Sequence, residues 1–191
     1  MQTVEVVNEF NKEILRDILF IHRNAFSPEW VYIDDEVYYR MKLRDKNSIN
    51  ILLNEDELRI GHLLAIPHND VLEELKEDDT EMKEDSMSYY IETVAILPDF
   101  RGRKGFSQML EHLIHELKMR GIHKLSLHAR VLNNLSTIIQ NKLRITEIRR
   151  IDKWKYHDYK EPTDYIEAVF DSSNLVRTIS TAILDKQTSF V

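Results

Sequence analysis

The first forty residues change from one hydrophobic period to another. Residues 3–10 alternate between apolar and polar positions, which predicts a strand. Residues 11–26 instead repeat their apolar positions every three to four residues, which predicts a helix with Asn11 as its N-cap. After the polar sequence SPEW, residues 34–43 predict a second, shorter helix.

The middle of the chain is dominated by strand patterns. Residues 48–54 and 57–66 predict a hairpin around a polar turn. Residues 86–97 predict a third strand, because they are rich in aromatic and β-branched side chains. A helical repeat then begins near Phe106, and Gly121 stands where a glycine ends a helix.

The remaining elements complete a mixed α/β fold. Residues 123–129 predict a strand, residues 134–143 a helix capped by Asn133 or Asn134, and residues 147–159 and 163–170 two closing strands. The order is strand, two helices, three strands, helix, strand, helix and two strands. It predicts an α+β domain over residues 1–170, in which helices flank a mixed, mostly antiparallel sheet.

A separate segment, residues 171–191, follows this domain. Its apolar stripe has helical spacing and consists of Leu175, Val176, Ile179, Ile183 and Leu184. Such a short helix must bury its stripe against something. We favour packing on the chain's own sheet, and the alternative is docking onto a second subunit in a homodimer.

Composition limits the classes of protein. The 191 residues are 42% apolar and 31% charged, with no apolar run long enough to cross a membrane and no secretory signal at the start. The chain has no cysteine, so disulfides and zinc–thiolate sites are excluded. We expect a cytoplasmic protein that binds neither membranes nor, given its net charge of −7, nucleic acid. We also expect no metal site, because His112 and His115, one helical turn apart beside Glu111 and Glu116, are typical of a solvent-facing helix surface. His62, His68 and His128 look isolated in the sequence and do not indicate a Ser-His-Asp triad.

The negative charge is concentrated in one place. Residues 70–85 hold nine acidic residues against two lysines, inside a predicted insertion at residues 67–87. We call residues 67–87 the acidic segment. Charge runs usually form solvated surface, so we favour a mobile surface excursion. The alternative is an electrostatic rim that attracts a cationic ligand.

The sequence ILPDFRGRKGFSQML, residues 96–110, combines backbone freedom with positive charge. Two of the four glycines, Gly102 and Gly105, lie here, beside Arg101, Arg103 and Lys104. A strand, a glycine loop and a helix start in succession present free backbone N–H groups at the positive end of the helix dipole. The segment therefore predicts a site for a phosphate or pyrophosphate.

Together with the element order, ETVAILPDFRGRKGFSQML resembles the acetyl-CoA site of the GNAT acyltransferase superfamily. The resemblance covers about residues 1–170 as element order and is specific over residues 91–145. It implies that acetyl-CoA is the cosubstrate, with loop amides on its pyrophosphate and a splayed strand along its pantetheine arm. The residues that it places at the cofactor are Val94, Ala95, Ile96, Arg101, Gly102, Arg103, Lys104, Gly105, Phe106, Ser107 and Asn133.

The glycine signature of the family fits in two registers. Without a gap, Arg101 takes the first signature place, but Lys104 and Phe106 fall where the small residues belong. If the loop is one residue longer, Gly105 and Ser107 fill those places and Gly102 takes the arginine place. We prefer the longer loop, because a lysine side chain would crowd the phosphate.

The same resemblance suggests catalytic and acceptor residues. Glu92 stands where many members of the family carry a base that takes the proton of the amine, although it could equally be a carboxylate paired with a cation. Gln140 falls at the place of the family's tyrosine acid and cannot give up a proton. Tyr156, Tyr159 and Tyr165 are alternative acids, each more typical of packing. Phe26, Trp30 and Tyr90 are expected at the acceptor, unless the first two close the core edge.

The resulting expectation is an acetyl-CoA-dependent N-acetyltransferase that acetylates a primary amine of a small molecule or peptide. The acidic segment favours a cationic acceptor such as a polyamine or a peptide amine. The alternative is a degenerate GNAT-fold binding or regulatory module without catalysis, because the glycine loop and the tyrosine place both depart from the pattern.

Overall fold

A computed structural model describes residues 1–31, 33–133, 135–156 and 159–170, except for the side chains of residues 153, 155–156 and 159–161. The strands are β1 (Gln2–Val7), β2 (Ile49–Glu55), β3 (Leu58–Pro67), β4 (Ser88–Ile96), β5 (Lys124–Arg130), β6 (Arg144–Tyr156) and β7 (Tyr159–Val169). The helices are α1 (Lys12–Ala25), α2 (Asp35–Lys42), α3 (Leu72–Leu75), α4 (Gly105–Met119) and α5 (Leu135–Lys142). Short 3₁₀ turns are η1 (Pro28–Trp30), η2 (His68–Val71), η3 (Pro98–Phe100) and η4 (Val131–Asn133).

The strands form one seven-stranded sheet in the order β1-β2-β3-β4-β5-β7-β6. Neighbouring strands are antiparallel except for β4 and β5, which are parallel. The predicted order of elements is confirmed, with α3 added inside the acidic segment. The predicted C-terminal helix and its packing lie outside the described residues.

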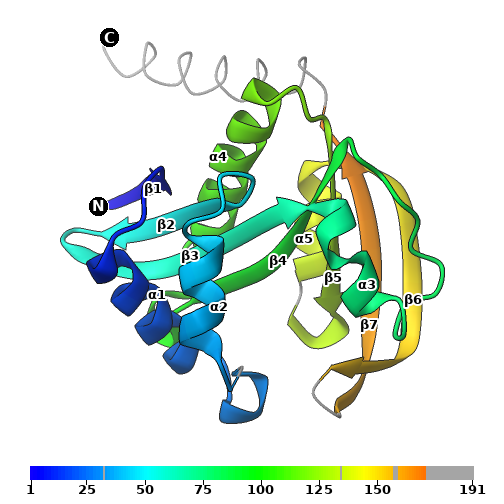
Figure 1. Ribbon diagram of the computed structural model, residues 1–191, viewed down its shortest axis with the longest axis horizontal. Coiled ribbons are helices and arrows are strands. Elements are labelled where there is room, and N and C mark those ends of the chain that lie inside the picture. Colours follow the sequence, from blue (N-terminus) through cyan, green and yellow to red (C-terminus); the bar gives the residue numbers. More distant parts are fainter. Residues whose placement is uncertain (32, 134, 157–158, 171–191) are drawn as a thin grey trace, which may run out of the picture.

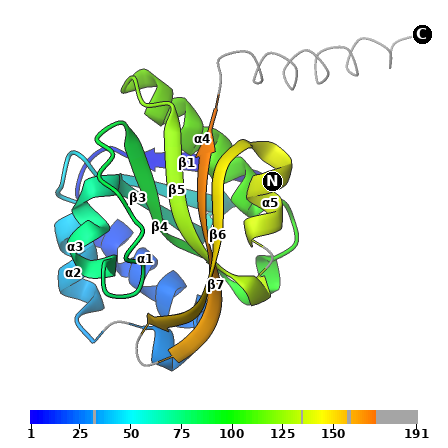
Figure 2. The same cartoon turned by 90° about the vertical axis from the view of Figure 1, so that its right-hand side faces the viewer.

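Helices cover both faces of the sheet. Helices α1, α2 and α3 lie on one side and α4 and α5 on the other, as Figures 1 and 2 show. Leu52, Leu64 and Ile66 of the sheet pack toward α1 and α2, whereas Ile51, Leu53 and Leu63 pack toward α4. This alternation is what a strand buried on both faces requires, since successive side chains point to opposite sides.

Helix ends follow the predicted chemistry. Asn11 Oδ1 accepts the Glu13 N–H at the start of α1, as the N-cap prediction required. At the end of α4, Gly121 has a φ of 73° and the Ile122 N–H donates to the Leu117 carbonyl over 2.9 Å. The glycine stop of this helix is therefore confirmed.

Candidate active site

Strands β4 and β5 separate within the sheet. Their parallel ladder ends at the Tyr90–Ser126 pair. Beyond it, in the described part of the chain, the rest of β4 pairs only with β3, and residues 127–130 of β5 pair only with β7. The sheet consequently opens between these strands, as the family resemblance led us to expect.

Glu92 lies at a β-bulge on the edge of this opening. Leu64 pairs with Thr93 and Ala65 pairs with Ile91, so Glu92 is the extra residue of β4. Bulges redirect a side chain and are common beside active sites. The Tyr38 hydroxyl donates to Glu92 Oε1, while Oε2 is buried and has no hydrogen-bond partner among the described residues. Burial raises the pKa of this carboxyl to about 8.

A cavity of about 150 Å³ occupies the opening. Its lining includes six of the predicted site residues, which are Phe26, Trp30, Tyr90, Glu92, Val94 and Asn133. Nine of the eleven predicted cofactor residues are not part of this lining. Among them, Ala95 and Phe106 are buried in the core, and Ile96 packs against the core on the α4 side. The structure thus brings the expected acceptor residues and the expected base to one place.

Phe26 and Trp30 form one wall of the cavity. Phe26 also packs against the core cluster. It therefore both lines the cavity and closes the edge of the core. Trp30 belongs to η1, and the Arg130 guanidinium lies 4.3 Å from its ring centroid. This cation–π contact joins the loop after α1 to the end of β5.

The loop before α4 has the backbone shape that the sequence predicted. Gly102 has a φ of 77° and Lys104 a φ of 64°, and α4 begins at Gly105 without a side-chain cap. The N–H groups of its first turn therefore remain available to an anion.

The three cationic side chains of this loop differ in their partners. Arg101 Nε donates to the Ile96 carbonyl over 2.9 Å, and Arg103 pairs with both oxygens of Glu55 at 3.2 Å. Within the described ranges, the Lys104 ammonium has no ion pair. Among the described residues, Arg103 is neutralised by an ion pair, Arg101 donates only to backbone carbonyls, and Lys104 has neither kind of contact.

The packing of α4 on the sheet requires a glycine at position 105. A Cβ atom there would overlap Leu53 Cδ2 and lie 3.3 Å from Ile96 Cδ1, so the glycine lets α4 approach the sheet. Lys104 meanwhile has the left-handed backbone that favours glycine. Lys104 therefore supports the register without a gap, and Gly105 supports the longer loop. The structure favours neither register over the other.

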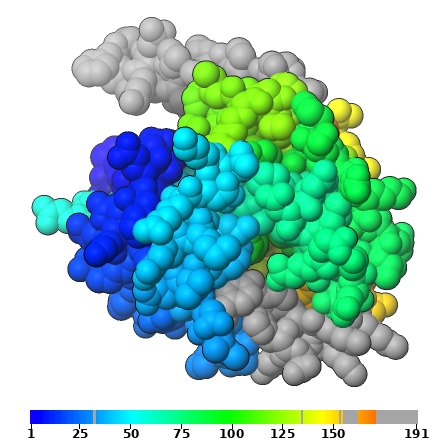
Figure 3. All heavy atoms as spheres, viewed as in Figure 1, coloured from blue at the N-terminus to red at the C-terminus, as the bar shows by residue number. Residues whose placement is uncertain are grey.

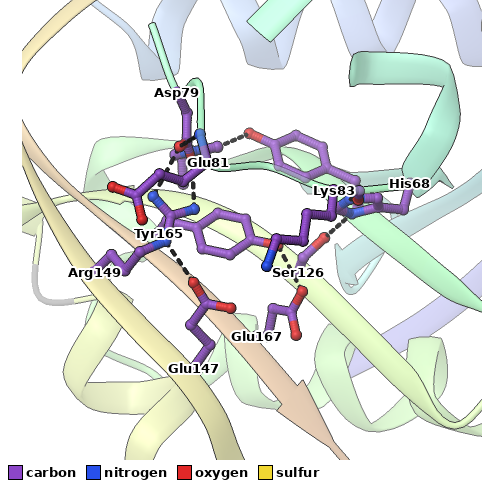
Figure 4. Close-up of polar contacts among 11 residues, drawn as sticks. His68, Asp79, Glu81, Lys83, Ser126, Glu147, Arg149, Tyr165 and Glu167 are labelled. Atoms are coloured by element: carbon purple, nitrogen blue, oxygen red, sulfur yellow. Dashed lines mark hydrogen bonds and ion pairs between the residues drawn. The ribbon is translucent and has the colours of Figure 1, made fainter. Parts of the chain in front are cut away.

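The acidic segment corrects one of our predictions. We favoured a mobile, solvated excursion, but Val71, Leu75 and Asp79 are buried, and the segment forms part of the domain surface (Figure 3). The Asp79 side chain is 1% exposed and accepts two hydrogen bonds of 2.8 Å from Arg149 (Figure 4). Burial opposes ionisation of Asp79, but bonds from His128 and Arg149 outweigh it and hold its pKa well below the usual value.

The three histidines that looked isolated are all hydrogen-bonded. His62 Nε2 lies 3.1 Å from Asn50 Oδ1, and His68 Nδ1 lies 2.6 Å from Ser126 Oγ. His128 contacts the Tyr90 hydroxyl through Nδ1 at 2.9 Å and Asp79 through Nε2 at 3.1 Å. The sequence did not indicate these contacts, because each partner is at least 12 residues away in the chain.

The predicted leaving-group residues do not gather at the cavity. Gln140 is exposed, donates to Ser136 Oγ over 2.9 Å and lies outside the cavity lining. The Tyr165 hydroxyl is engaged with Glu167 at 2.9 Å, which agrees with a packing tyrosine. The side chains of Tyr156 and Tyr159 lie outside the described part of the chain.

Sequence reasoning missed Thr163 and Tyr38. Thr163 is 1% exposed and lines the cavity, and its Oγ1 has no hydrogen-bond partner within the described residues. It sits opposite Arg130 in the β5–β7 ladder. No local sequence pattern indicates either residue. Sheet register brings Thr163 to the opening, and the packing of α2 brings Tyr38 to Glu92.

Two kinds of feature are absent from the described residues. They contain no cluster of three or more His, Asp or Glu side chains suited to a metal ion. No helix within them has the length and apolar character needed to span a bilayer.

The comparisons agree with this geometry. The model of the acetyltransferase (GNAT) family matches residues 12–138. Comparison with curated protein sequences gives no significant match.

Solved structures share the fold at low sequence identity. The ribosomal-protein-S18-alanine N-acetyltransferase of Escherichia coli is 17% identical, with a TM-score of 0.62 over 91% of this chain and 97% of its own. PaiA N-acetyltransferase of Thermoplasma acidophilum, in complex with coenzyme A, is 13% identical, with a TM-score of 0.60 over 88% and 99%. YncA of Salmonella typhimurium, with its cofactor acetyl-CoA, is 12% identical, with a TM-score of 0.59 over 90% and 95%. Since the family match covers more than half of the sequence and the sheet opens as the family requires, the chain belongs to the acetyltransferase (GNAT) family.

Proposed function

We propose that this protein transfers an acetyl group from acetyl-CoA to a primary amine bound in the cavity between β4 and β5. The observation that carries the proposal is Glu92 at the bulge, with an unpartnered buried oxygen in the cavity. Thr163 Oγ1 is a second acceptor there that has no hydrogen-bond partner among the described residues. A primary ammonium group has three N–H donors and would satisfy both atoms when the Glu92 carboxyl is ionised.

The loop and the opening suit acetyl-CoA. An uncapped helix start, two residues with positive φ and the Lys104 charge favour the pyrophosphate at residues 102–107. The free edge of β4 from Ile91 onward offers backbone groups to the pantetheine arm. When bound, acetyl-CoA supplies the acetyl group as a thioester, whose C–S bond breaks as the new C–N bond forms. We place Val94, Lys104 and the 102–107 backbone at the cofactor.

Glu92 is proposed to take the amine proton above about pH 8. Its pKa of about 8 means that the carboxyl holds a proton at neutral pH and becomes a base only as the pH rises. The sequence alone suggested that Glu92 would matter most near neutral pH, and burial of the carboxyl moves that window upward.

The acceptor is proposed to be cationic. Glu74 of the acidic segment lines the cavity together with Glu92, and carboxylates near a cavity raise the local concentration of positive ligands. The Escherichia coli neighbour is named for acetylating a ribosomal-protein alanine, so peptide N-termini belong in the test beside polyamines. Cytoplasmic location and the homodimer stay predictions.

Acetyl-CoA binding and transfer test the proposal in two steps. At one hundred times its dissociation constant, acetyl-CoA should raise the free energy of unfolding by about 2.7 kcal/mol. Acetyl transfer to polyamines, to peptides and to neutral amines of matched size then measures the acceptor preference. No stabilisation contradicts the cofactor assignment, whereas stabilisation without transfer to any amine favours the non-catalytic binding module.

Glu92→Gln tests the base. The wild-type rate should rise through about pH 8, whereas the variant should gain rate only as the free amine appears near pH 10. We therefore expect the largest ratio of wild-type to variant kcat/KM between these values, at about 100-fold. A ratio that stays constant across the pH range would make Glu92 a structural residue.

A further inference from the structure

A chain of polar side chains leads from the cavity into the acidic segment. It starts at Tyr90, which lines the cavity two residues before Glu92. The Tyr90 hydroxyl contacts His128, His128 contacts Asp79, and Asp79 contacts Arg149. The four residues come from β4, β5, the acidic segment and β6, so the fold alone assembles them.

Donor and acceptor roles along this chain follow from Asp79. Because Arg149 and His128 keep Asp79 ionised, its carboxylate can only accept hydrogen bonds. The proton of neutral His128 must then be on Nε2, which leaves Nδ1 as an acceptor. The Tyr90 hydroxyl therefore donates to Nδ1, and a hydroxyl oxygen that donates its proton still has the lone-pair chemistry to accept another.

We propose that Tyr90, His128 and Asp79 form a proton relay that removes the amine proton at neutral pH, with Arg149 as a positioning residue for Asp79. The proposal rests on the proposed function, because it concerns the same cavity and the same amine. It gives the acidic segment a part in the reaction, since Asp79 is one of its residues.

The proton transfer balances within these residues. An N–H bond of the ammonium breaks, its electron pair stays on nitrogen, and the proton goes to Tyr90 Oη. The hydroxyl proton of Tyr90 moves at the same time to His128 Nδ1. The resulting imidazolium is paired with the Asp79 carboxylate, 3.1 Å from Nε2.

The surroundings of His128 suit a buried base. Its side chain is 3% exposed and stacks on Trp154 with centroids 4.2 Å apart. The titratable or charged groups that face it are Asp79, Tyr90, Arg149, His68 and Tyr165. Burial lowers the pKa of His128 and Asp79 opposes this effect, while Glu92 still holds its proton at neutral pH.

Tyr90→Phe is the decisive variant, because it removes one oxygen and keeps the ring. His128→Gln breaks the next link. Tyr89→Phe is the matched control, since the neighbouring Tyr89 hydroxyl donates to the Asn47 carbonyl over 3.0 Å and does not line the cavity.

Nitrogen-15 NMR of the histidine rings tests the geometry without any activity. His128, assigned by the loss of its signals in His128→Gln, should be the Nε2–H tautomer. Its Nδ1 resonance should shift in Tyr90→Phe and stay in place in Tyr89→Phe. An Nδ1–H tautomer, or an Nδ1 signal that ignores Tyr90→Phe, would overturn the relay.

Enzyme kinetics test whether the relay takes part in acetyl transfer. At pH 7, Tyr90→Phe should lower kcat about 100-fold while the KM of the amine changes little, and its remaining rate should rise through about pH 8. His128→Gln should do the same, and the double variant should lose no more than either single one, because the residues act as a unit.

The outcomes separate the two proposals. A wild type that transfers no acetyl group overturns the proposed function and the relay with it. A wild type that transfers acetyl, together with a Tyr90→Phe variant of full rate at pH 7 or a double variant that loses the product of the two effects, overturns the relay alone.

Discussion

The loop before α4 and the Asp79–His128–Tyr90 network are both polar, but they are built in opposite ways. The loop is local: a strand end, Gly102, Lys104 and the start of α4 follow one another within about ten residues. The network is assembled over long range, since Asp79 meets His128 and Arg149 across 49 and 70 residues. The loop side chains are exposed, whereas Asp79 is almost fully buried.

This difference determines where energy and function reside. A local loop presents backbone groups to a ligand, and its side chains contribute little to folding because water screens them. A buried network must be satisfied within the domain, so losing one member leaves charges without partners. Substitutions in the network should therefore change stability, and substitutions in the loop should mainly change binding.

Asp79→Asn should have the largest effect on stability. It removes the carboxylate charge that faces Arg149, which keeps Glu147 as its other partner, and weakens the hydrogen bond that His128 Nε2 donates. We expect this to cost about 3 kcal/mol of unfolding free energy at pH 7. Because the folded pKa of Asp79 lies below its ordinary value of 3.8, this contribution is present above pH 3.8 and is lost as the pH falls further. Denaturant unfolding of wild type and variant at pH 7 and pH 3 measures the loss of stability and its dependence on pH.

Asp85→Asn is the control for that variant within the same segment. Asp85 pairs with Lys124 over 2.9 Å, but both side chains are about one quarter exposed. We expect a loss of about 0.5 kcal/mol. Equal losses from the two variants would show that Asp79 has no special weight in the fold.

Gly105→Val should have an intermediate effect on stability, because this end of the loop packs against the sheet. Its side chain would collide with Leu53 under α4, and overpacking of this kind costs about 2 kcal/mol. Gly102→Ala faces open space, so it should lose only about 1 kcal/mol through its positive φ. Thermal unfolding compares them, with Gly121→Ala as a control of similar φ at the far end of α4.

Lys104→Gly should have the smallest effect on stability, below about 1 kcal/mol, because relief of its left-handed backbone is offset by added freedom of the unfolded chain. If the loop is a binding element, acetyl-CoA should bind this variant more weakly while its stability hardly changes. Calorimetric titration of wild type and variant measures the difference. Unchanged affinity would contradict a role for the Lys104 charge.

Much of the fold could be predicted from the sequence because its signals are local. Hydrophobic periods gave the order of strands and helices, Asn11 and Gly121 marked helix ends, and the glycine loop indicated the family. The burial of Asp79 could not be predicted, since acidic runs are usually solvated and its partners are distant. The same holds for Thr163 and for the Tyr90–His128 contact, which depend on sheet register and on the path of the acidic segment.

The short parallel ladder between β4 and β5 has a mechanical consequence. Three residue pairs join the half-sheet β1–β4 to the half-sheet β5–β7–β6. The acidic segment crosses this seam with three more links, from His68 to Ser126, from Asp85 to Lys124, and from Asp79 to His128 and Arg149. The acidic segment therefore ties the two half-sheets together. Widening of the cavity by separation of the half-sheets requires these side-chain contacts to break first.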